Sequence, residues 1–178
     1  TELAGWGPRG TAGVSLAAAL HFDDVTVELG GRKVLNGFTL AMPPGEIVCL
    51  LGDSGSGKST ALRAAAGIQR IGSGSVRIND NVVSGPGIHL PPDRRGIGLM
   101  FQDFALFPHL SLLQNVTFGL NRLGRAAALA QARQALRRVG LGDRENDFPH
   151  MLSGGQQQRL ALARSIAPRP GILMLDEP

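Results

Sequence analysis

A glycine-rich run, GDSGSGKST at residues 52–60, stands between an apolar segment and a stretch of helix-forming residues. It fits the sequence G-x-x-x-x-G-K-S/T, a loop in which backbone N–H groups converge on a phosphate. We expect Ile47–Leu51 before it to form a strand buried on both faces, and Ser59–Ala66 after it to form a helix. This order of strand, loop and helix predicts an α/β fold with a phosphate site at the N-terminus of the helix.

Backbone and side-chain groups divide the work of this loop. Side chains at Gly55 or Gly57 would obstruct the approach of the phosphate to the backbone. Lys58 is predicted to reach the terminal phosphates, and the Ser59 hydroxyl to ligate Mg²⁺. The predicted nucleotide-binding residues of the loop are Gly52, Asp53, Ser54, Gly55, Ser56, Gly57, Lys58, Ser59 and Thr60.

Two carboxylates follow a second apolar run, Ile172–Leu175, which we expect to be another buried strand. They stand at the carboxyl end of that strand, where ligands bind in open α/β sheets. Asp176 suits the coordination shell of Mg²⁺, and Glu177 suits orienting or deprotonating an attacking water. An acidic pair after a strand is more often a turn or a helix cap. The phosphate loop favours the catalytic interpretation here.

A third motif, LSGGQQQR at residues 152–159, begins a helix that is predicted to run to about Ala167. Ser153 is its predicted N-cap. Together with the free N–H groups of Gly154 and Gly155, it forms a candidate anion site at the helix N-terminus. Two phosphate-binding segments in one chain indicate that two chains share each nucleotide.

The remaining sequence predicts strands and helices around these motifs. Leu20–Leu29 alternates roughly between apolar and polar residues, and Gly30-Gly31 marks a hairpin turn. We expect further strands at Val34–Met42, Ser75–Ile78 and Gly96–Met100, and helices at Ser111–Leu120 and Ala126–Val139.

Four motifs, in their order along the chain, resemble those of the nucleotide-binding subunits of ABC transporters, and the resemblance covers about Leu20 to Pro178. The motifs are GDSGSGKST, Gln102 within LMFQ, LSGGQQQR and ILMLDEP. The resemblance implies a RecA-like P-loop NTPase core, an N-terminal antiparallel β subdomain and an inserted helical subdomain at about residues 104–167. Residues 1–19 are rich in glycine and alanine without a period, which predicts a loose tail from composition alone. The resemblance to ABC transporter subunits also implies ATP and Mg²⁺ as cofactors. ATP would bind between the P-loop of one subunit and the LSGGQ signature of the other in a head-to-tail homodimer.

The resemblance also assigns roles by position. Gln102 would contact Mg²⁺ and the attacking water, and would join Ser59 and Asp176 as a metal ligand. The catalytic residues would be Glu177, Gln102 and Lys58. Leu29 stands where the family usually places an aromatic residue against adenine, so it offers apolar contact without ring stacking. The signature residues that contact the partner's ATP would be Ser153, Gly154, Gly155 and Gln156.

The run FQDFALFPHL at residues 101–110, with Asn115-Val116 after it, is similar to importer ATPases for ferric iron, polyamines, sulfate or sugars. LPPDRR at residues 90–95 fits the same group. The similarity implies an ATP hydrolase on the cytoplasmic face of the inner membrane, bound peripherally to two membrane-spanning permease subunits. An extracytoplasmic solute-binding protein would serve it indirectly. Ferric iron is the first expectation for the solute.

Composition leaves one alternative open, a soluble ABC ATPase that acts on nucleic acid. The formal net charge is +4, and no acidic residue stands between Phe104 and Gly142. That run is either a solvated helix face or a docking surface. Seven Phe and one Trp are too few for a platform that stacks single strands. Cys49 is the only cysteine, which excludes a cysteine-based zinc site. We therefore expect no nucleic-acid partner.

The family's histidine-bearing switch and its later core strands would follow Pro178, so the C-terminal part of the core is expected to be missing from this sequence. Glu177 would then lie at a fraying end, where a base is poorly held. A second alternative is therefore a truncated fragment that binds nucleotide without useful turnover.

Overall fold

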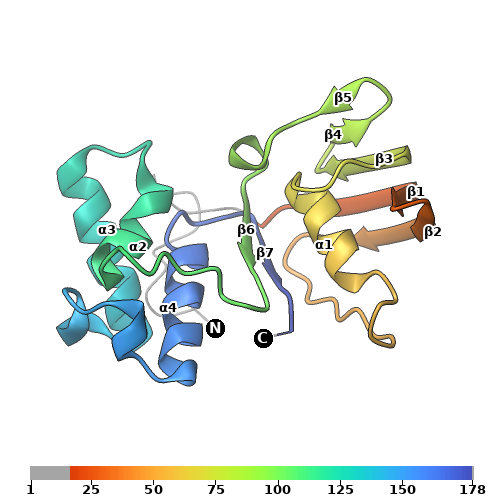
Figure 1. Cartoon of the computed structure of the whole chain (residues 1–178). Helices are drawn as coiled ribbons and strands as arrows, with labels where there is room; N and C mark the ends of the chain where they lie inside the picture. The colour runs from red at the N-terminus through yellow and green to blue at the C-terminus, as the bar shows by residue number, and fades with distance from the viewer. Residues whose placement is uncertain (1–16, 178) are drawn as a thin grey trace. The chain divides into compact units, whose positions relative to one another are not determined.

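A computed structural model describes residues 17–177 and forms two compact units, one ending at Ile97 and the other beginning at Gly98 (Figure 1). Residues 1–16 of the predicted N-terminal tail lie outside the described residues. The predicted catalytic and binding residues divide between the two units.

The first unit is built on a five-stranded antiparallel sheet in the order β2-β1-β3-β4-β5. The predicted hairpin is confirmed, because Gly30 and Gly31 adopt left-handed conformations that suit a tight turn between β1 and β2. Neither β4 nor β5 was predicted from the sequence. The strands are β1 (Leu20–Leu29), β2 (Arg32–Met42), β3 (Ser73–Ile78), β4 (Asn81–Gly85) and β5 (Ile88–His89).

An irregularity in β1 explains its imperfect alternation. Leu20, Phe22, Val25 and Val27 are all buried, although the step from Phe22 to Val25 is three residues instead of two. The pairing register shifts between these two residues, and Asp24 has a φ of 51°. A bulge here restores the inward direction of the apolar side chains.

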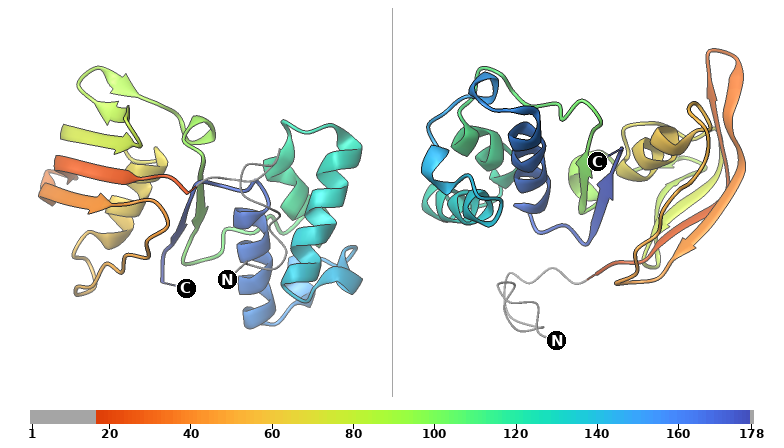
Figure 2. Two further views of the ribbon diagram at one scale, coloured as in Figure 1. Left: turned by 180° about the vertical axis from the view of Figure 1, so that it is seen from behind. Right: turned by 90° about the horizontal axis from the view of Figure 1, so that it is seen from below.

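Helix α1 (Lys58–Ala66) packs on one face of this sheet (Figures 1 and 2). Its buried side chains are all alanines, namely Ala61, Ala64, Ala65 and Ala66. The helix ends at Gly67, whose left-handed conformation lets its N–H reach the last carbonyls. The predicted helix is thus confirmed, one residue longer at its start.

The predicted strand at Ile47–Leu51 is wrong. The segment has no assigned secondary structure, and Ile47 and Leu51 are 94% and 92% exposed. A strand forms only where a neighbouring strand pairs with its backbone N–H and C=O groups. Among the described residues, neither sheet places a strand beside this segment. Its apolar sequence was correctly identified, but sequence alone did not supply its pairing partner.

The second unit joins a two-stranded sheet to a helical cluster. β6 (Ile97–Met100) pairs with β7 (Ile172–Leu175), and the helices are α2 (Leu112–Thr117), α3 (Arg125–Arg138) and α4 (Gly154–Ile166). Leu173 and Leu175 are 41% and 39% exposed, so β7 is buried on one face and not on both as expected. Its side chains alternate between buried and exposed, because successive side chains of a strand point to opposite faces.

An apolar core holds the three helices together. It is formed by Leu112, Val116, Leu120, Ala128, Ala132, Ala135, Leu136, Leu141, Leu152, Leu160, Ala163 and Ala167. Ser111 begins α2 with a capping box: Ser111 Oγ accepts from the N–H of Gln114 at 3.3 Å, and Gln114 Oε1 accepts from the N–H of Ser111 at 2.9 Å. The predicted helix at Ser111–Leu120 ends earlier, at Thr117, and continues as a 3₁₀ turn over Phe118–Leu120.

Candidate functional site

The glycine-rich loop at residues 52–57 closes around the ammonium group of Lys58. Lys58 Nζ donates hydrogen bonds to the carbonyl oxygens of Gly52 and Asp53, each at 2.8 Å. The N–H of Ser56 donates to the carbonyl of Asp53 at 3.1 Å and tightens the turn. An anion entering the loop would compete for the same ammonium group. The cation predicted to bind phosphate is therefore positioned by the loop itself.

Gly57 is required by both its conformation and its surroundings. Its φ is 98°, a left-handed value that favours glycine. A Cβ at this position would lie 2.8 Å from the carbonyl oxygen of Val34 and 2.9 Å from Leu35 Cδ2. Gly55 has a φ of 80° but has no neighbour within 4 Å of such a Cβ. Gly57 therefore lets α1 begin close against β2.

The β6–β7 pair brings together two predicted residues that are far apart in the sequence. Gln102 Nε2 donates to Glu177 Oε2 at 2.7 Å. One more backbone hydrogen bond, from the N–H of Asp176 to the carbonyl of Met100 at 3.0 Å, extends the β6–β7 pairing past the end of β7. Asp176 is only 4% exposed. Glu177 has a φ of 48°, which turns the chain away from the strand direction.

The oxygen donors in the predicted metal set suit a hard cation. Ser59 offers a hydroxyl, Gln102 an amide carbonyl and Asp176 a carboxylate, which are ligand types that Mg²⁺ accepts. Ser59 belongs to the first unit and the other two to the second. Over residues 17–177, no group of three His, Cys, Asp or Glu side chains is arranged to hold a metal ion. The metal-binding role of these three residues therefore stays a prediction.

The signature segment begins α4 in the predicted position. Gly154 and Gly155 are exposed in the first turn of the helix, and no atom lies within 4 Å of where a Cβ would stand. Gln156 Oε1 accepts from the N–H of Ser153 at 2.9 Å and from Arg144 Nη1 at 3.1 Å. Arg144 also pairs with Asp147 at 2.6 Å. Gln156 therefore stabilises the start of the helix, a role that the spacing S-x-x-Q signals.

The residue predicted to contact adenine, Leu29, lies at the end of β1 opposite Arg32. It is 43% exposed, so its side chain is accessible for apolar contact. Phe22, in contrast, is buried and packs edge-on against Phe38 with ring centroids 5.1 Å apart. Phe22 therefore belongs to the core.

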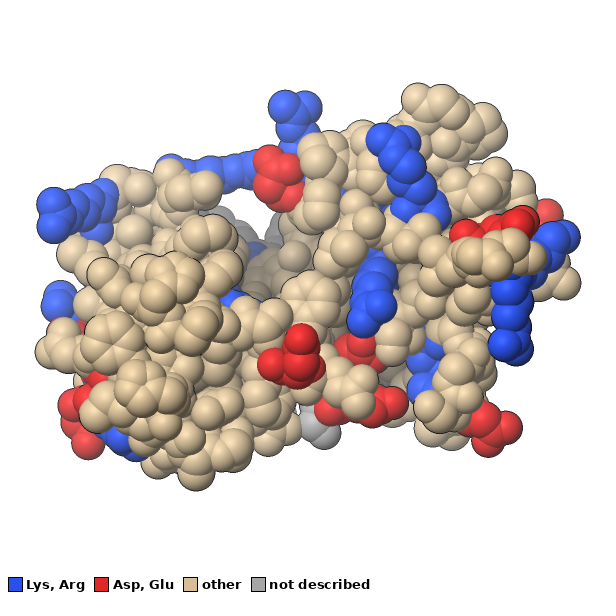
Figure 3. Space-filling view, viewed as in Figure 1, with Lys and Arg blue, Asp and Glu red and all other residues tan. Residues whose placement is uncertain are grey.

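Within the run without acidic residues, Arg133 is paired with an acidic side chain from outside the run. Glu145, which lies just beyond it, pairs with Arg133 through two hydrogen bonds of 2.8 and 3.1 Å. The Arg133 hydrogen bond lowers the pKa of the Glu145 carboxyl, and Glu145 raises the pKa of Arg133. On the face drawn in Figure 3, basic side chains are interspersed with acidic ones. Arg133 thus has an intramolecular role that its sequence context did not indicate.

Sequence reasoning missed the role of Arg95, a buried arginine in the first unit that is only 4% exposed. Its guanidinium donates to the carbonyls of Ala64 at 3.0 Å and Ala65 at 2.9 Å, at the end of α1. It also donates to the carbonyls of Val83 and Leu90 and to Ser84 Oγ, at 2.8 to 2.9 Å. Burial lowers the pKa of Arg95 to about 10. This one side chain therefore ties the P-loop helix to β4.

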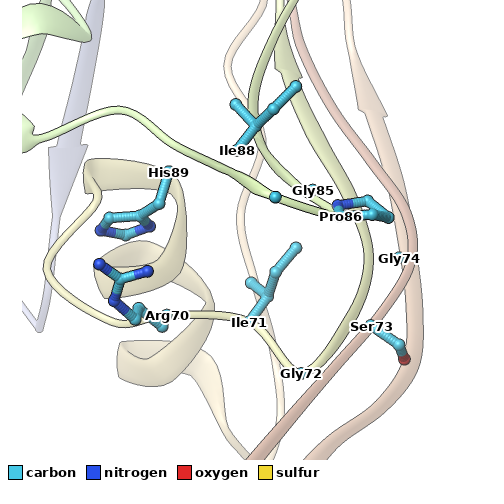
Figure 4. A pocket seen from close by; sticks show the side chains of 10 residues that line it. Arg70, Ile71, Gly72, Ser73, Gly74, Gly85, Pro86, Ile88 and His89 are labelled. Atoms are coloured by element: carbon cyan, nitrogen blue, oxygen red, sulfur yellow. The ribbon is translucent and has the colours of Figure 1, made fainter.

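A cavity of about 430 Å³ opens beside β5 in the first unit, and Arg70 and His89 face each other at its wall (Figure 4). Burial, with smaller contributions from Arg70 and Arg95, lowers the pKa of His89. None of the predicted site residues lines this cavity. His89 thus lines a cavity that contains none of the predicted site residues.

Comparison with known proteins agrees with these motifs. The ABC transporter family model matches residues 35–178. This chain belongs to the ABC transporter family. Among solved structures, the ATP-binding cassette MJ0796 in a dimeric post-hydrolysis state bound to ADP and Pi is 31% identical, with a TM-score of 0.78 over 88% of this chain and 73% of that one. The fold is accordingly that of an ABC ATPase cassette, α/β with a RecA-like P-loop core.

Several curated relatives of this ABC chain carry names of import proteins. The putative 2-aminoethylphosphonate import ATP-binding protein PhnT of Salmonella paratyphi A is 46% identical over 96% of this chain and 44% of its own length. The Fe(3+) ions import ATP-binding protein FbpC of Streptomyces coelicolor is 47% identical over 89% and 45%. The spermidine/putrescine import ATP-binding protein PotA of Methylococcus capsulatus is 41% identical over 95% and 43%. This chain spans less than half the length of these relatives.

Proposed function

We propose that this chain is the ATP-binding and ATP-hydrolysing part of an ABC importer. The observation that carries the proposal is the pairing of β6 with β7, which sets Gln102 2.7 Å from Glu177 and next to the buried Asp176. A carboxylate that accepts a hydrogen bond from an amide is held in one direction, as a general base requires. The import functions named for three relatives support the transport role.

The residues of the P-loop would hold the phosphates of ATP. Lys58 would exchange the carbonyls of Gly52 and Asp53 for oxygens of the terminal phosphates. Ser59, Gln102 and Asp176 would each offer an oxygen to Mg²⁺, which would supply positive charge against the phosphates. Glu177 would take a proton from the attacking water, and the exposed Leu29 would contact adenine.

Two copies would share each nucleotide. Gly154 and Gly155 are exposed in the first turn of α4, where backbone N–H groups would suit an anion bound from outside this chain. The solved relative MJ0796 is a dimer bound to ADP and Pi. We propose a homodimer in which Ser153–Gln156 of one subunit faces the P-loop of the other.

The partners would be two permease subunits, with an extracytoplasmic binding protein delivering the solute. No helix within residues 17–177 has the length and apolar character to span a membrane. A subunit bound peripherally at the cytoplasmic face of the inner membrane fits that finding. Ferric iron is the solute that we propose first, on two relatives named for it at 47% and 48% identity. The relative named for 2-aminoethylphosphonate, at 46%, makes an organophosphonate the direct alternative.

The importer proposal is tested by what stimulates ATP hydrolysis. In the transporter reconstituted with its permease subunits, adding solute-loaded binding protein should raise phosphate release several-fold. Adding duplex DNA or RNA in low salt, where electrostatic binding is strongest, should leave the rate unchanged. The matched control is binding protein without solute. Stimulation by nucleic acid and none by the loaded binding protein would contradict the proposal.

A further inference from the structure

The loop that carries Gln102 contains two consecutive residues in an unfavourable conformation. Phe104 and Ala105 have φ values of 60° and 45°, in the left-handed region that side chains with a Cβ rarely adopt. Neither residue is glycine, so the loop does not hold this shape by local preference. Such a conformation persists where the surrounding structure imposes it.

Arg164, near the end of α4, provides the contacts that impose it. Arg164 Nη2 donates to the carbonyl of Phe104 at 2.8 Å, and Nη1 donates to the carbonyl of Ala105 at 2.7 Å. The guanidinium carbon also lies 5.4 Å from the centroid of the Phe107 ring. The planar fork of arginine matches two adjacent carbonyls, which a lysine ammonium does not. One side chain thus holds three residues of the loop.

A second anchor holds the far end of the same loop. Asn115, fully buried in α2, accepts from the N–H of Phe107 at 2.9 Å and donates to the carbonyls of Phe107 and Leu110 at 3.1 and 2.9 Å. The segment from Phe107 onward is therefore fixed to α2. Between Gln102 and that anchor, Arg164 supplies the side-chain hydrogen bonds to Phe104 and Ala105. Figure 1 shows this loop leaving β6 on its way to α2.

The position of Arg164 on α4 connects two parts of the proposed site. Gly154 begins α4, and Arg164 stands ten residues later in the same continuous helix. At 1.5 Å per residue, about 15 Å of helix separates them. The signature and the arginine therefore belong to one uninterrupted helix.

We propose that Arg164 is a positioning residue that holds the Gln102 loop in its working conformation and couples it to the signature helix. The inference rests on the proposed function, since it assigns Gln102 and the signature to ATP hydrolysis. Burial lowers the pKa of Arg164, while Asp103 acts in the opposite direction. The side chain acts through Gln102, which in turn holds Glu177.

The first test measures the position of the loop without reference to activity. Hydrogen exchange of the amides of residues 102–106 should become at least tenfold faster in Arg164→Ala than in the wild-type protein. Arg159→Ala is the matched control, because Arg159 lies on the same helix and donates to a different backbone carbonyl, that of Val139 at 3.0 Å. Its exchange over residues 102–106 should equal that of the wild type. Equal exchange in Arg164→Ala would overturn the proposal.

The second test is a double-mutant cycle on phosphate release by the transporter assembled with its permease subunits. Arg164→Ala should lower kcat by about ten- to a hundredfold at nearly unchanged KM for ATP. In a Gln102→Ala background the same change should lower kcat by less than about threefold, because each substitution alone already disrupts the same arrangement of the Gln102 loop. The kcat of Arg164→Lys should fall between those of the wild type and Arg164→Ala. If Arg164→Ala does not fold, Arg164→Lys replaces it in the cycle. If the kcat losses of the two single variants multiply in the double variant, the proposal is overturned. If Gln102→Ala has the kcat of the wild type, the proposed role of Gln102 is refuted instead.

Discussion

Replacing Arg95 with methionine is expected to lower the free energy of unfolding by about 3–5 kcal/mol. Methionine fills part of the volume of the arginine but donates no hydrogen bonds. It would leave the acceptors on Ala64, Ala65, Val83, Ser84 and Leu90 without their buried donor. Each unsatisfied buried acceptor costs roughly 1–3 kcal/mol, reduced where water enters. Urea unfolding of the purified protein measures the loss.

The neighbouring arginine provides the control for Arg95. Arg94 is exposed and stands in the same short turn, so Arg94→Met should change the free energy of unfolding by less than about 0.5 kcal/mol. Similar losses for the two variants would show that the hydrogen bonds at the end of α1 contribute little.

Replacing Lys58 with alanine should remove most ATP turnover. The ammonium group is held by the carbonyls of Gly52 and Asp53 at the mouth of the P-loop, where no other side chain of that loop carries a positive charge. Loss of a positioned cation costs about 2–4 kcal/mol of transition-state stabilisation, roughly a 30- to 1,000-fold decrease in turnover. Phosphate release at saturating Mg·ATP measures it.

The chain offers a matched control, because Lys33 is its only other lysine and is exposed on β2. Lys33→Ala should keep wild-type turnover. Equal turnover in Lys58→Ala and Lys33→Ala, with both proteins folded, would remove Lys58 from the site.

Much of the fold could be predicted because local signals were strong. The glycine pair at residues 30–31, the alanine-rich α3 and the capping residue Ser111 each determine an element through its own sequence. Ile47–Leu51 was predicted as a strand from its apolar character, yet strand formation depends on a partner that the segment itself does not encode. β4 and β5 were missed because they are short and contain two glycines and a proline at their connection.

The residues that carry the chemistry of the site were easier to predict than the residues that hold them in place. The Lys58 loop and the acidic pair are contiguous motifs, so their spacing alone identifies them. The supporting groups lie far from what they hold: Arg95 is 31 residues from Ala64, and Arg164 is 60 residues from Phe104. An isolated arginine in sequence gives no sign of the carbonyls it will meet. Only the capping role of Gln156 carried a local signal, and it was overlooked.

The proposed hydrolytic site is tested most directly by steady-state phosphate release from the transporter with its permease subunits, comparing wild type with Glu177→Gln. Glutamine keeps the size of the side chain and its contact with Gln102 but removes the basic carboxylate. We expect a loss of turnover of about a hundredfold or more, with ATP affinity retained, since the P-loop is unaltered. Turnover equal to wild type in Glu177→Gln would contradict the assignment of Glu177 as the base and, with it, the proposed hydrolytic site.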